Sequence, residues 1–349
     1  MPMLYYRIFA RMNSADVAKV RELLSQSNTI LIVPHKNPDG DAIGSTLGLH
    51  HFLKVLGKTS HVIVPNDYPK FLKWMPGNNT IVNFERQHDY AEGLIKKADL
   101  IFTLDFNHLS RTGQMQGILE SSEATFIMID HHQAPDDYAS VTYSDVAMSS
   151  TCEMVYNVID SFNEVASITP EMATCLYTGI MTDTGSFKFS STTSRTHRVV
   201  AELIDKGAQN MQIHQYVFDA NSPARLHLLG TALNNLVILD EYRTAFITLS
   251  QKELDQHNFS KGDTEGFVNY GLTLENIVFA VIFIENQEEG IIKISFRSSG
   301  SFSVNAFARE HFNGGGHTNA AGGRSTASME QTLKRFTSLL KDYQNQLRA

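Results

Sequence analysis

Three short apolar segments in the first half of the chain are each followed at once by Asp or His. Thr29–Val33 leads into Pro34-His35-Lys36-Asn37-Pro38-Asp39-Gly40-Asp41, Leu100–Leu104 leads into Asp105, and Thr125–Ile129 leads into Asp130-His131-His132. Segments that are apolar throughout are typical of strands buried on both faces of a parallel sheet. In open α/β sheets, ligands bind beyond the carboxyl ends of the strands. The sequence therefore predicts an α/β fold with a polar site at one edge of a mostly parallel sheet.

The order of the remaining segments predicts two domains. Helical spacing follows the first strand and recurs in four later segments, which are Ser149–Phe162, Pro170–Met181, Thr196–Lys206 and Ala224–Leu236. A second strand-rich region then contains Ala245–Leu249, Ile277–Ile284, Ile291–Phe296, a glycine-rich loop at Gly314–Gly316 and a final helix at Met329–Leu347. A length of 349 residues also suits two domains. We expect a first domain over residues 1–206, a helical linker over 207–240 and a smaller α/β domain over 241–349.

Composition narrows the classes of function. The 29 Lys and Arg residues against 37 Asp and Glu residues give a net charge of −8, which argues against a basic protein that binds long nucleic acids. Two cysteines, Cys152 and Cys175, exclude a disulfide framework and a cysteine-rich zinc fold. Residues 291–349 carry eight basic and three acidic side chains, which is compatible with an anion-binding region or with a solvated C-terminal helix.

No segment of the sequence suggests a membrane protein. Arg7 and Arg11 interrupt the apolar start of the chain, so residues 1–12 form no signal-peptide core. The longest apolar run, Ile277–Ile284, is far shorter than the roughly 20 residues of a membrane helix. We expect a cytoplasmic protein.

The Asp and His residues at the strand ends fit a site for two metal ions. A single Asp after a strand is usually a cap or turn residue, but three neighbouring strand ends that share this feature favour a ligand site. Asp39, Asp41, Asp105 and Asp183 supply four negative charges, and His35 and His131 add neutral nitrogen ligands. Two ions about 3.5–4 Å apart can hold a hydroxide and the oxygens of a phosphoryl group. Donors of this kind suit Mn²⁺, with Mg²⁺ or Co²⁺ as substitutes.

Five motifs in the chain resemble those of the DHH phosphoesterases. They are His35-x-Asn37-Pro38-Asp39-Gly40-Asp41-Ala42, Asp105, Asp130-His131-His132, Thr182-Asp183-Thr184-Gly185 and the distal Gly314-Gly315-Gly316-His317-Thr318-Asn319-Ala320-Ala321-Gly322. The last motif is similar to the signature of the DHH-associated C-terminal domain. The length and the compact second domain most resemble the branch of nanoRNases and pAp phosphatases, where pAp is 3′-phosphoadenosine 5′-phosphate.

The resemblance implies a role for each residue of the first domain. His35, Asp39 and Asp105 would hold one Mn²⁺, and Asp41, Asp105, His131 and Asp183 the other, with Asp105 as the bridge. His132 would face the substrate phosphate, and Asp130 would orient an imidazole. Asn37 would contact phosphate or stabilise its loop, and Arg111, which follows the strand that ends at Asp105, is a less favoured candidate for a phosphate contact. The segment Met148-Ser149-Ser150-Thr151 resembles the family's helix start, and we expect it to cap a helix.

The resemblance also implies a substrate-binding second domain, with the active-site cleft between the two domains. Gly315 and Gly316 would let backbone amides approach an anion, and His317 and Asn319 would contact phosphate or base. Arg297, followed by Ser298, would grip a terminal phosphate. The alternatives are a flexible glycine turn and an ordinary arginine at a strand end.

The expected activity is hydrolysis of short 5′-phosphorylated oligonucleotides, such as nanoRNA and pApA, or of pAp to AMP, by hydroxide attack at a two-metal site. A phosphodiesterase for c-di-AMP or linear dinucleotides is the alternative, and an inorganic pyrophosphatase, a single-strand exonuclease or a catalytically dead nucleotide-binding module is less favoured. The expected partners are a small nucleotide substrate, no long nucleic acid, no membrane and, from the branch, a second copy in a homodimer.

Overall fold

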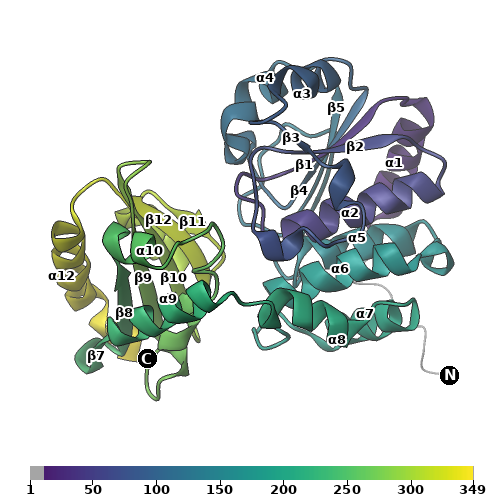
Figure 1. The fold of residues 1–349 in the computed structure, drawn as a ribbon. Coiled ribbons are helices and arrows are strands. Elements are labelled where there is room, and N and C mark those ends of the chain that lie inside the picture. Colours follow the sequence, from purple (N-terminus) through teal and green to yellow (C-terminus); the bar gives the residue numbers. More distant parts are fainter. Residues whose placement is uncertain (1–11, 349) are drawn as a thin grey trace. The chain divides into compact units, whose positions relative to one another are not determined.

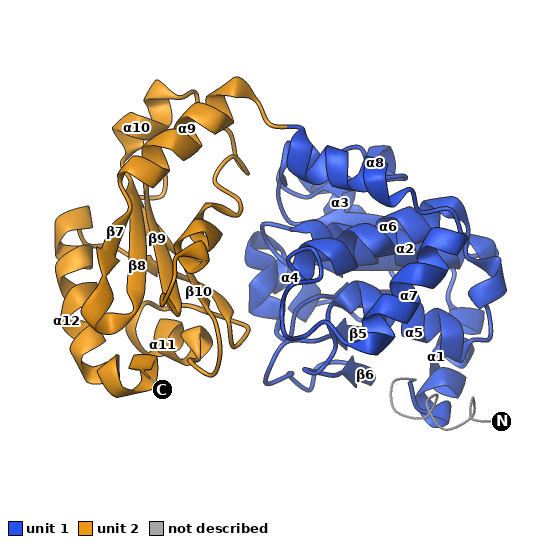
Figure 2. Cartoon of the chain, turned by 90° about the horizontal axis from the view of Figure 1, so that it is seen from below, with its two compact units in different colours: residues 1–220 blue, residues 221–349 orange. Residues whose placement is uncertain are grey.

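The computed structural model describes residues 12–348, which form two compact units that divide between Ala220 and Asn221 (Figure 2). The division falls within the stretch 207–240 that the sequence assigned to a linker. Helix α8 (Asn210–His214) and the π-helical turn Gln215–Asp219 precede it, and helix α9 (Pro223–Asn234) follows it. The predicted absence of a signal-peptide core concerns residues that lie almost entirely outside the described part.

Unit 1 is built on a six-stranded sheet in the order β3-β2-β1-β4-β5-β6, and all of its paired strands are parallel. Its strands are β1 (Ile30–Pro34), β2 (Ser60–Val64), β3 (Val82–Asn83), β4 (Leu100–Leu104), β5 (Thr125–Asp130) and β6 (Val141–Ser144). From β1 the chain first builds toward β3 and then continues on the other side from β4. This reversal is the topological switch point at which open α/β sheets bind ligands.

Helices cover both faces of this sheet, because alternate residues of each buried strand point to opposite faces. Ile30 and Ile32 face a core shared with α1, α2, α5, α6 and α7, whereas Leu31 and Val33 face a second core with α3 and α4 (Figure 1). These helices are α1 (Ser14–Gln26), α2 (Gly40–Val55), α3 (His88–Ile95), α4 (Gln116–Glu120), α5 (Thr151–Ser161), α6 (Pro170–Asp183) and α7 (Ser194–Asp205).

Glycines let α2 and α6 approach each other closely. A Cβ atom on Gly44 would lie 2.6 Å from the carbonyl oxygen of Cys175, and one on Gly179 would lie 3.1 Å from the Cα atom of Asp41. At the start of α2, a Cβ on Gly40 would collide with Thr182 near the end of α6. The two helices therefore run antiparallel, which places Asp41 in the first turn of α2 beside Asp183 at the end of α6.

Unit 2 is a smaller α/β structure on a mixed sheet in the order β11-β12-β10-β9-β8-β7. Strands β8 and β9 are parallel and the other pairs are antiparallel. The strands are β7 (Val237–Leu239), β8 (Thr244–Leu249), β9 (Phe279–Asn286), β10 (Ile291–Ser298), β11 (Gly315–Gly316) and β12 (Ala320–Ser325). Helices α9 and α10 (Gln251–Gln256) pack on one face, and α11 (Val304–His311) and α12 (Met329–Arg348) on the other. The predicted α/β class with a smaller second α/β domain is confirmed.

The glycine-rich segment differs from the predicted loop. Gly315 and Gly316 form the short strand β11, which pairs with Gly322 and Ala321 of β12. A Cβ atom on Gly314 would overlap the carbonyl group of Gly322. The strand was missed because glycine has low strand propensity, whereas the close backbone contact of this hairpin requires residues without side chains.

Within the described residues, no helix is both long and apolar enough to cross a membrane.

Candidate active site

The polar strand ends of unit 1 meet at the switch point of the sheet. Strands β1 and β4 pair with Pro34 opposite Leu104, and β4 and β5 pair with Leu104 opposite Ile129. His35, Asp105 and Asp130 follow these three aligned positions. The Asp105 amide also donates to the carbonyl of Ile129 over 3.1 Å, which continues the ladder by one bond. The register therefore brings together side chains that the sequence separates by up to 95 positions.

Asp105 lies at the centre of the site. Its backbone is in the left-handed region, with φ of 67°, a conformation that costs free energy for a residue with a side chain. The buried carboxylate places Oδ2 3.4 Å from Nε2 of His35 and Oδ1 3.4 Å from Nε2 of His131. The hydroxyl of Thr151 donates to the same Oδ1 over 3.0 Å. Each oxygen of Asp105 thus faces a different imidazole.

The first group of candidate ligands consists of His35, Asp39 and Asp105, whose ligand atoms all lie within 4.8 Å of one another. Nδ1 of His35 lies 2.8 Å from the carbonyl oxygen of Lys36. Because a carbonyl only accepts hydrogen bonds, Nδ1 carries a proton and Nε2 is the ligand nitrogen. Oδ1 of Asp39 accepts from the amides of Asp41 and Ala42 at the start of α2, and Oδ2 lies 3.9 Å from Nε2 of His35.

The second group consists of Asp41, His131 and Asp183, again within 4.8 Å of one another. Nε2 of His131 lies 3.8 Å from Asp41 Oδ2 and 3.5 Å from Asp183 Oδ2. Its Nδ1 lies 3.2 Å from the carbonyl oxygen of Met148, so the same tautomer argument applies. The amides of Thr151 and Cys152 donate to Asp41 over 2.6 and 2.8 Å, which places this carboxylate at the positive end of α5.

Burial and mutual repulsion perturb the charges of these groups. Burial raises the pKa of Asp41 well above its usual value, and the charges of Asp105 and Asp183 add to this shift. Burial also opposes ionisation of Asp105, but hydrogen bonding to His131 and His35 holds the pKa of Asp105 well below its usual value. Burial lowers the pKa of both histidines, but the neighbouring carboxylates outweigh it and raise the pKa of His131 and of His35. The carboxylates therefore hold positive charge beside them, as a cation-binding site does.

The donor set fits hard divalent cations. It contains carboxylate oxygens and two imidazole nitrogens of defined tautomer, with Asp105 able to serve both groups. The nearest thiol, Cys152, is buried, and its sulfur lies 3.6 Å from the backbone oxygen of Asp41. Burial and the negative charge of Asp41 raise the pKa of this thiol, so it stays protonated and is not a thiolate ligand. Mn²⁺, Mg²⁺ and Co²⁺ all accept oxygen and nitrogen ligands of this kind. The bound ion and the ligand assignments stay predictions.

Asp130 and His132 form a separate pair beside Asp105. Nδ1 of His132 lies 2.7 Å from Oδ1 of Asp130, and both side chains are buried. The carboxylate accepts this bond and thereby sets the orientation of the ring. The second oxygen of Asp130 has no hydrogen-bond partner among the described residues. Asp130 can therefore orient the imidazole of His132, and its role in the reaction stays a prediction.

Asn37 and Arg111 lie at the rim of the site. The backbone of Asn37 is left-handed, with φ of 56°, and its amide and side chain form two 2.7 Å hydrogen bonds with the side chain of Asn66. These bonds support the loop-stabilising alternative for Asn37. The carbonyl of Arg111 accepts from the amide of Lys36 over 2.7 Å, and the charge of Arg111 acts on the pKa of His35 in the lowering direction. Arg111 is therefore close enough to influence the site.

Two of the candidate substrate-binding residues of unit 2, Ser298 and Asn319, form hydrogen bonds with each other and with nearby carbonyls. The Asn319 side chain donates to Oγ of Ser298 over 2.8 Å and to the carbonyl of Gly300 over 3.0 Å. The buried hydroxyl of Ser298 in turn donates to the carbonyl of Phe302. Arg297 is half-buried in β10, and its Nη1 donates to the carbonyl of the preceding residue. Asn319 and Ser298 thus have a structural role in this unit, and their contact with substrate stays a prediction.

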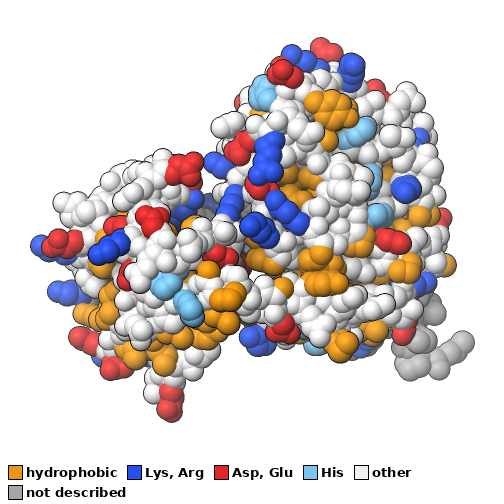
Figure 3. Space-filling view, viewed as in Figure 1, with side chains coloured by type: hydrophobic (Ala, Val, Ile, Leu, Met, Phe, Trp, Pro, Cys, Tyr) orange, Lys and Arg blue, Asp and Glu red, His pale blue; other side chains and the backbone are white. Residues whose placement is uncertain are grey.

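The glycine hairpin depends on a residue that the sequence did not indicate. Oδ1 of Asn305, on α11, accepts from the amide of Gly316 over 3.1 Å and from Nε of Arg309 over 3.2 Å. The amide of His317 donates to the carbonyl of Ala320. These contacts account for the hairpin without a ligand, and anion binding there stays a prediction. On the face of unit 2 seen in Figure 3, basic side chains are interspersed with acidic ones.

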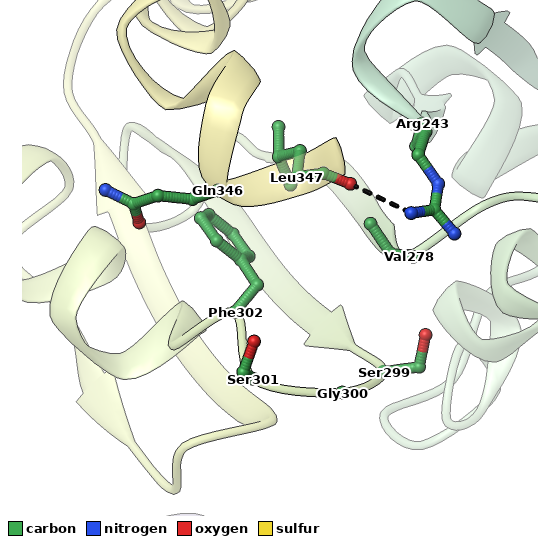
Figure 4. Close-up of a pocket in the computed structure, with 8 residues that line it drawn as sticks. All are labelled: Arg243, Val278, Ser299, Gly300, Ser301, Phe302, Gln346 and Leu347. Atoms are coloured by element: carbon green, nitrogen blue, oxygen red, sulfur yellow. Dashed lines mark hydrogen bonds between the residues drawn. The ribbon is translucent and has the colours of Figure 1, made fainter. Parts of the chain in front are cut away.

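A cavity of about 250 Å³ in unit 2 is lined in part by Gly300 and Phe302, whose carbonyls accept from Asn319 and Ser298 (Figure 4). Its lining includes Arg243, Phe302 and Leu347, and none of its lining residues is a histidine or a carboxylate. Arg243 donates to the carbonyls of Asn276 and Leu347 and so ties the start of β8 to the end of α12. The cavity lacks the groups that phosphoester hydrolysis needs.

The start of α5 has more roles than the sequence indicated. The hydroxyl of Ser150 accepts from the amide of Glu153 over 3.1 Å, so the predicted cap is confirmed. The contacts of Thr151 and Cys152 with Asp41 and Asp105 were missed. The only available signal was a helix start near the motifs, because hydrogen bonds between residues about 110 positions apart leave no local pattern.

A parallel sheet with carboxylates and imidazoles at its switch point defines a phosphoesterase of the DHH class. The profile of the DHH family N-terminal domain matches residues 29–180, and that of the DHHA1 domain matches residues 242–346. The chain belongs to this family and is an enzyme of the phosphoesterase class. It is 33% identical over 293 residues to the bifunctional oligoribonuclease and PAP phosphatase NrnA of Thermus thermophilus, covering 84% of this chain and 83% of the relative.

Two further relatives are similar over most of the chain. The crystal structure of an exopolyphosphatase-related protein from Bacteroides fragilis superimposes with a TM-score of 0.92 at 41% identity, covering 97% of this chain and 98% of the other. The cyclic-di-AMP phosphodiesterase GdpP of Geobacillus thermodenitrificans is 25% identical over 93% of this chain, which corresponds to 49% of GdpP.

Proposed function

We propose that the protein is a manganese-dependent phosphohydrolase that cleaves short 5′-phosphorylated oligonucleotides and dephosphorylates pAp to AMP. The observation that carries this proposal is the carboxylate of Asp105, whose two oxygens each lie 3.4 Å from a different imidazole. A carboxylate placed in this way can serve two cation sites at once, as two-metal phosphoryl transfer requires. The names of the relatives supply the substrate class.

The two candidate ligand groups would hold the ions. His35, Asp39 and Asp105 would bind one Mn²⁺, and Asp41, His131 and Asp183, together with Asp105, would bind the other. When bound, the ions supply a nucleophile at neutral pH and neutralise charge on the transferred phosphoryl group. The amides of Thr151 and Cys152 keep Asp41 in place for this task.

His132 is the proposed contact with the reacting phosphate. Its Nδ1 lies 2.7 Å from Oδ1 of Asp130, a contact that fixes the ring plane, and Nε2 is the atom proposed to act toward the substrate. A histidine held in this way stabilises negative charge on a phosphate oxygen or donates a proton to the leaving oxygen. Asp130 acts through His132 and not on the substrate itself.

Two features favour small substrates. The net charge of −8 opposes binding of long polyanions, because such binding depends on many phosphate contacts. The T. thermophilus relative, which matches along most of both chains, is named for oligoribonuclease and PAP phosphatase activities. Arg297, His317 and Asn319 of unit 2 and Arg111 of unit 1 are the proposed phosphate and base contacts.

Hydrolysis of c-di-AMP or of a linear dinucleotide is the second candidate. The similarity to GdpP, named as a cyclic-di-AMP phosphodiesterase, covers 93% of this chain and favours it. The same proposed site would act on either phosphodiester, so the two candidates differ in substrate and not in catalytic residues.

A turnover panel tests the proposal. Purified protein is assayed with pAp, pApA, c-di-AMP, RNA oligonucleotides of increasing length, pyrophosphate and polyphosphate, each with Mn²⁺ and with Mg²⁺. We expect AMP from pAp and mononucleotides from the shortest RNAs, fastest with Mn²⁺. Turnover of c-di-AMP alone would support the second candidate, and turnover of pyrophosphate or polyphosphate alone would refute both.

Two variants tie the activity to the site. Asp105→Ala and the combined change of Asp130, His131 and His132 to alanine should abolish AMP release from pAp. The ligand atoms of His88, Asp89 and Glu92 on α3 also lie within 4.8 Å of one another, so the combined change of these residues to alanine is a matched control that should retain activity. Activity that survives in the site variants would place the reaction elsewhere.

A further inference from the structure

A buried carboxylate that the proposed mechanism does not use lies in the first turn of α5. The side chain of Glu153 is 2% exposed. One of its oxygens, Oε2, accepts hydrogen bonds from the hydroxyls of Ser149 and Thr196, the latter over 2.9 Å. Nε of Arg195 lies 4.0 Å from its other oxygen. A carboxylate is costly to bury, so these partners are needed to keep it there.

The two hydroxyls come from different segments. Ser149 directly precedes Ser150, the N-cap of α5. Thr196 belongs to the first turn of α7, where it forms a reciprocal capping box with Thr193. Glu153 therefore joins the start of α5, the segment before it and the start of α7 at one point.

The same turn of α5 holds two of the candidate metal ligands. The Thr151 and Cys152 amides donate to Asp41, and the Thr151 hydroxyl donates to Asp105. These donors lie one and two residues before Glu153. A shift of the helix start would change the positions of both carboxylates together.

We propose that Glu153 is a positioning residue, which anchors the first turn of α5 so that Thr151 and Cys152 hold Asp41 and Asp105 in the geometry for metal binding. This inference rests on the proposed function only in taking Asp41 and Asp105 as metal ligands. It assigns Glu153 no contact with substrate or metal.

The experiment compares Glu153→Ala with Glu153→Gln by titration calorimetry with Mn²⁺ and no substrate. Alanine removes both hydroxyl contacts, and we expect Mn²⁺ binding to weaken by about tenfold or more, as is typical when a group that supports a metal ligand is lost. The amide oxygen of glutamine still accepts from both hydroxyls, so Glu153→Gln should bind Mn²⁺ within roughly threefold of the unaltered protein.

A second readout follows the metal-free protein. Hydrogen exchange at the amides of Thr151 and Cys152 should accelerate in Glu153→Ala and stay slow in Glu153→Gln. Val158→Ala, which removes a buried side chain further along α5, is the matched control for a general loss of stability. It should leave Mn²⁺ affinity and exchange at these two amides unchanged.

Ser149→Ala provides a test if Glu153→Ala does not fold, because it removes one hydroxyl and leaves the carboxylate. We expect Mn²⁺ binding weakened by roughly threefold or more. Unaltered protein that does not bind Mn²⁺ would refute the proposed function. Unaltered protein that binds Mn²⁺, with Ser149→Ala and every folded Glu153 variant binding equally well, would refute the role of Glu153 alone.

Discussion

Oδ1 of Asp105 lies 3.4 Å from Nε2 of His131, and the other oxygen of the same carboxylate lies equally close to His35. A single residue at the end of β4 therefore joins the two groups of candidate ligands. Asp105 is also held by Thr151 and has a left-handed backbone, so its position is determined by several elements at once.

Asp105→Asn tests the bridging role. Asparagine has nearly the same shape but is neutral and offers one oxygen instead of two. We expect kcat for pAp to fall by about a thousandfold, in line with the several kcal/mol that metal ions contribute to phosphoryl transfer. Asp89→Asn, at a fully exposed position on α3, is the control and should have normal kcat. A kcat within about tenfold of normal for Asp105→Asn would contradict the bridge.

Thr151→Val tests the hydroxyl that supports Asp105. Valine keeps the shape but leaves a buried carboxylate oxygen without this donor, so the free energy of unfolding should fall by about 1–3 kcal/mol. Urea denaturation of the metal-free protein measures this change. Thr151→Ser keeps the hydroxyl and should lose much less stability. An unchanged free energy of unfolding in Thr151→Val would show that the hydroxyl does not support Asp105.

Gly44→Ala tests the close approach of α2 and α6. The new methyl group would lie 2.6 Å from the carbonyl oxygen of Cys175, so the helices must separate, and we expect a loss of about 1–3 kcal/mol in unfolding free energy. Gly93→Ala on α3 is the control, since a Cβ there meets nothing within 4 Å. It should stabilise the protein by up to about 1 kcal/mol through helix propensity.

The low pKa of His50 on α2 predicts that the protein loses stability in mild acid. Burial, together with the charges of His51, Lys54 and His61, lowers the pKa of His50 to about 4 in the folded protein. Between the ordinary histidine pKa of about 6.5 and this value, the unfolded chain binds a proton that the folded chain does not. The free energy of unfolding therefore falls as the pH drops through this window. The expected loss is about 1–2 kcal/mol, which allows for the partial exposure of His50.

Urea denaturation of the unaltered protein and of His50→Gln, at neutral pH and at about pH 5, measures the contribution of His50. The variant should lose less stability than the unaltered protein over this interval. Parallel losses would assign the acid sensitivity to other groups.

Arg297→Ala tests the proposed grip on a terminal phosphate. We expect KM for short oligonucleotides to rise by about tenfold or more with kcat little changed, because the contact is made equally in the ground state and the transition state. Arg297→Lys keeps the charge but not the paired donors. Its KM should therefore lie between that of the unaltered protein and that of Arg297→Ala. Unchanged kinetics in Arg297→Ala would leave Arg297 with a structural role only.

Much of the catalytic unit was predictable because its signals are local. β4 spans Leu100–Leu104 as predicted, and β1 and β5 differ from the prediction by one residue at their ends. Their uniform apolar character reports burial on both faces, and the Asp and His residues that follow mark a ligand-binding edge. That His35, Asp105 and His131 lie together could be expected from parallel pairing alone.

Other parts had no local signal. The hairpin of β11 and β12 has the composition of a loop, and the two-residue strand β3 is too short to show a period. Asn66, which braces Asn37, and Asn305, which braces Gly316, are single polar residues whose partners lie 29 and 11 positions away.

The sequence by itself determined the two kinds of domain, the buried strands and the chemical nature of the site, because these depend on which residue types follow one another. The tertiary structure decided how the site is held. Thr151 reaches Asp41 across 110 positions, and Glu153 reaches Thr196 across 43. Such contacts depend on strand register and on the close packing of α2, α5 and α6, which arise only when the whole core forms.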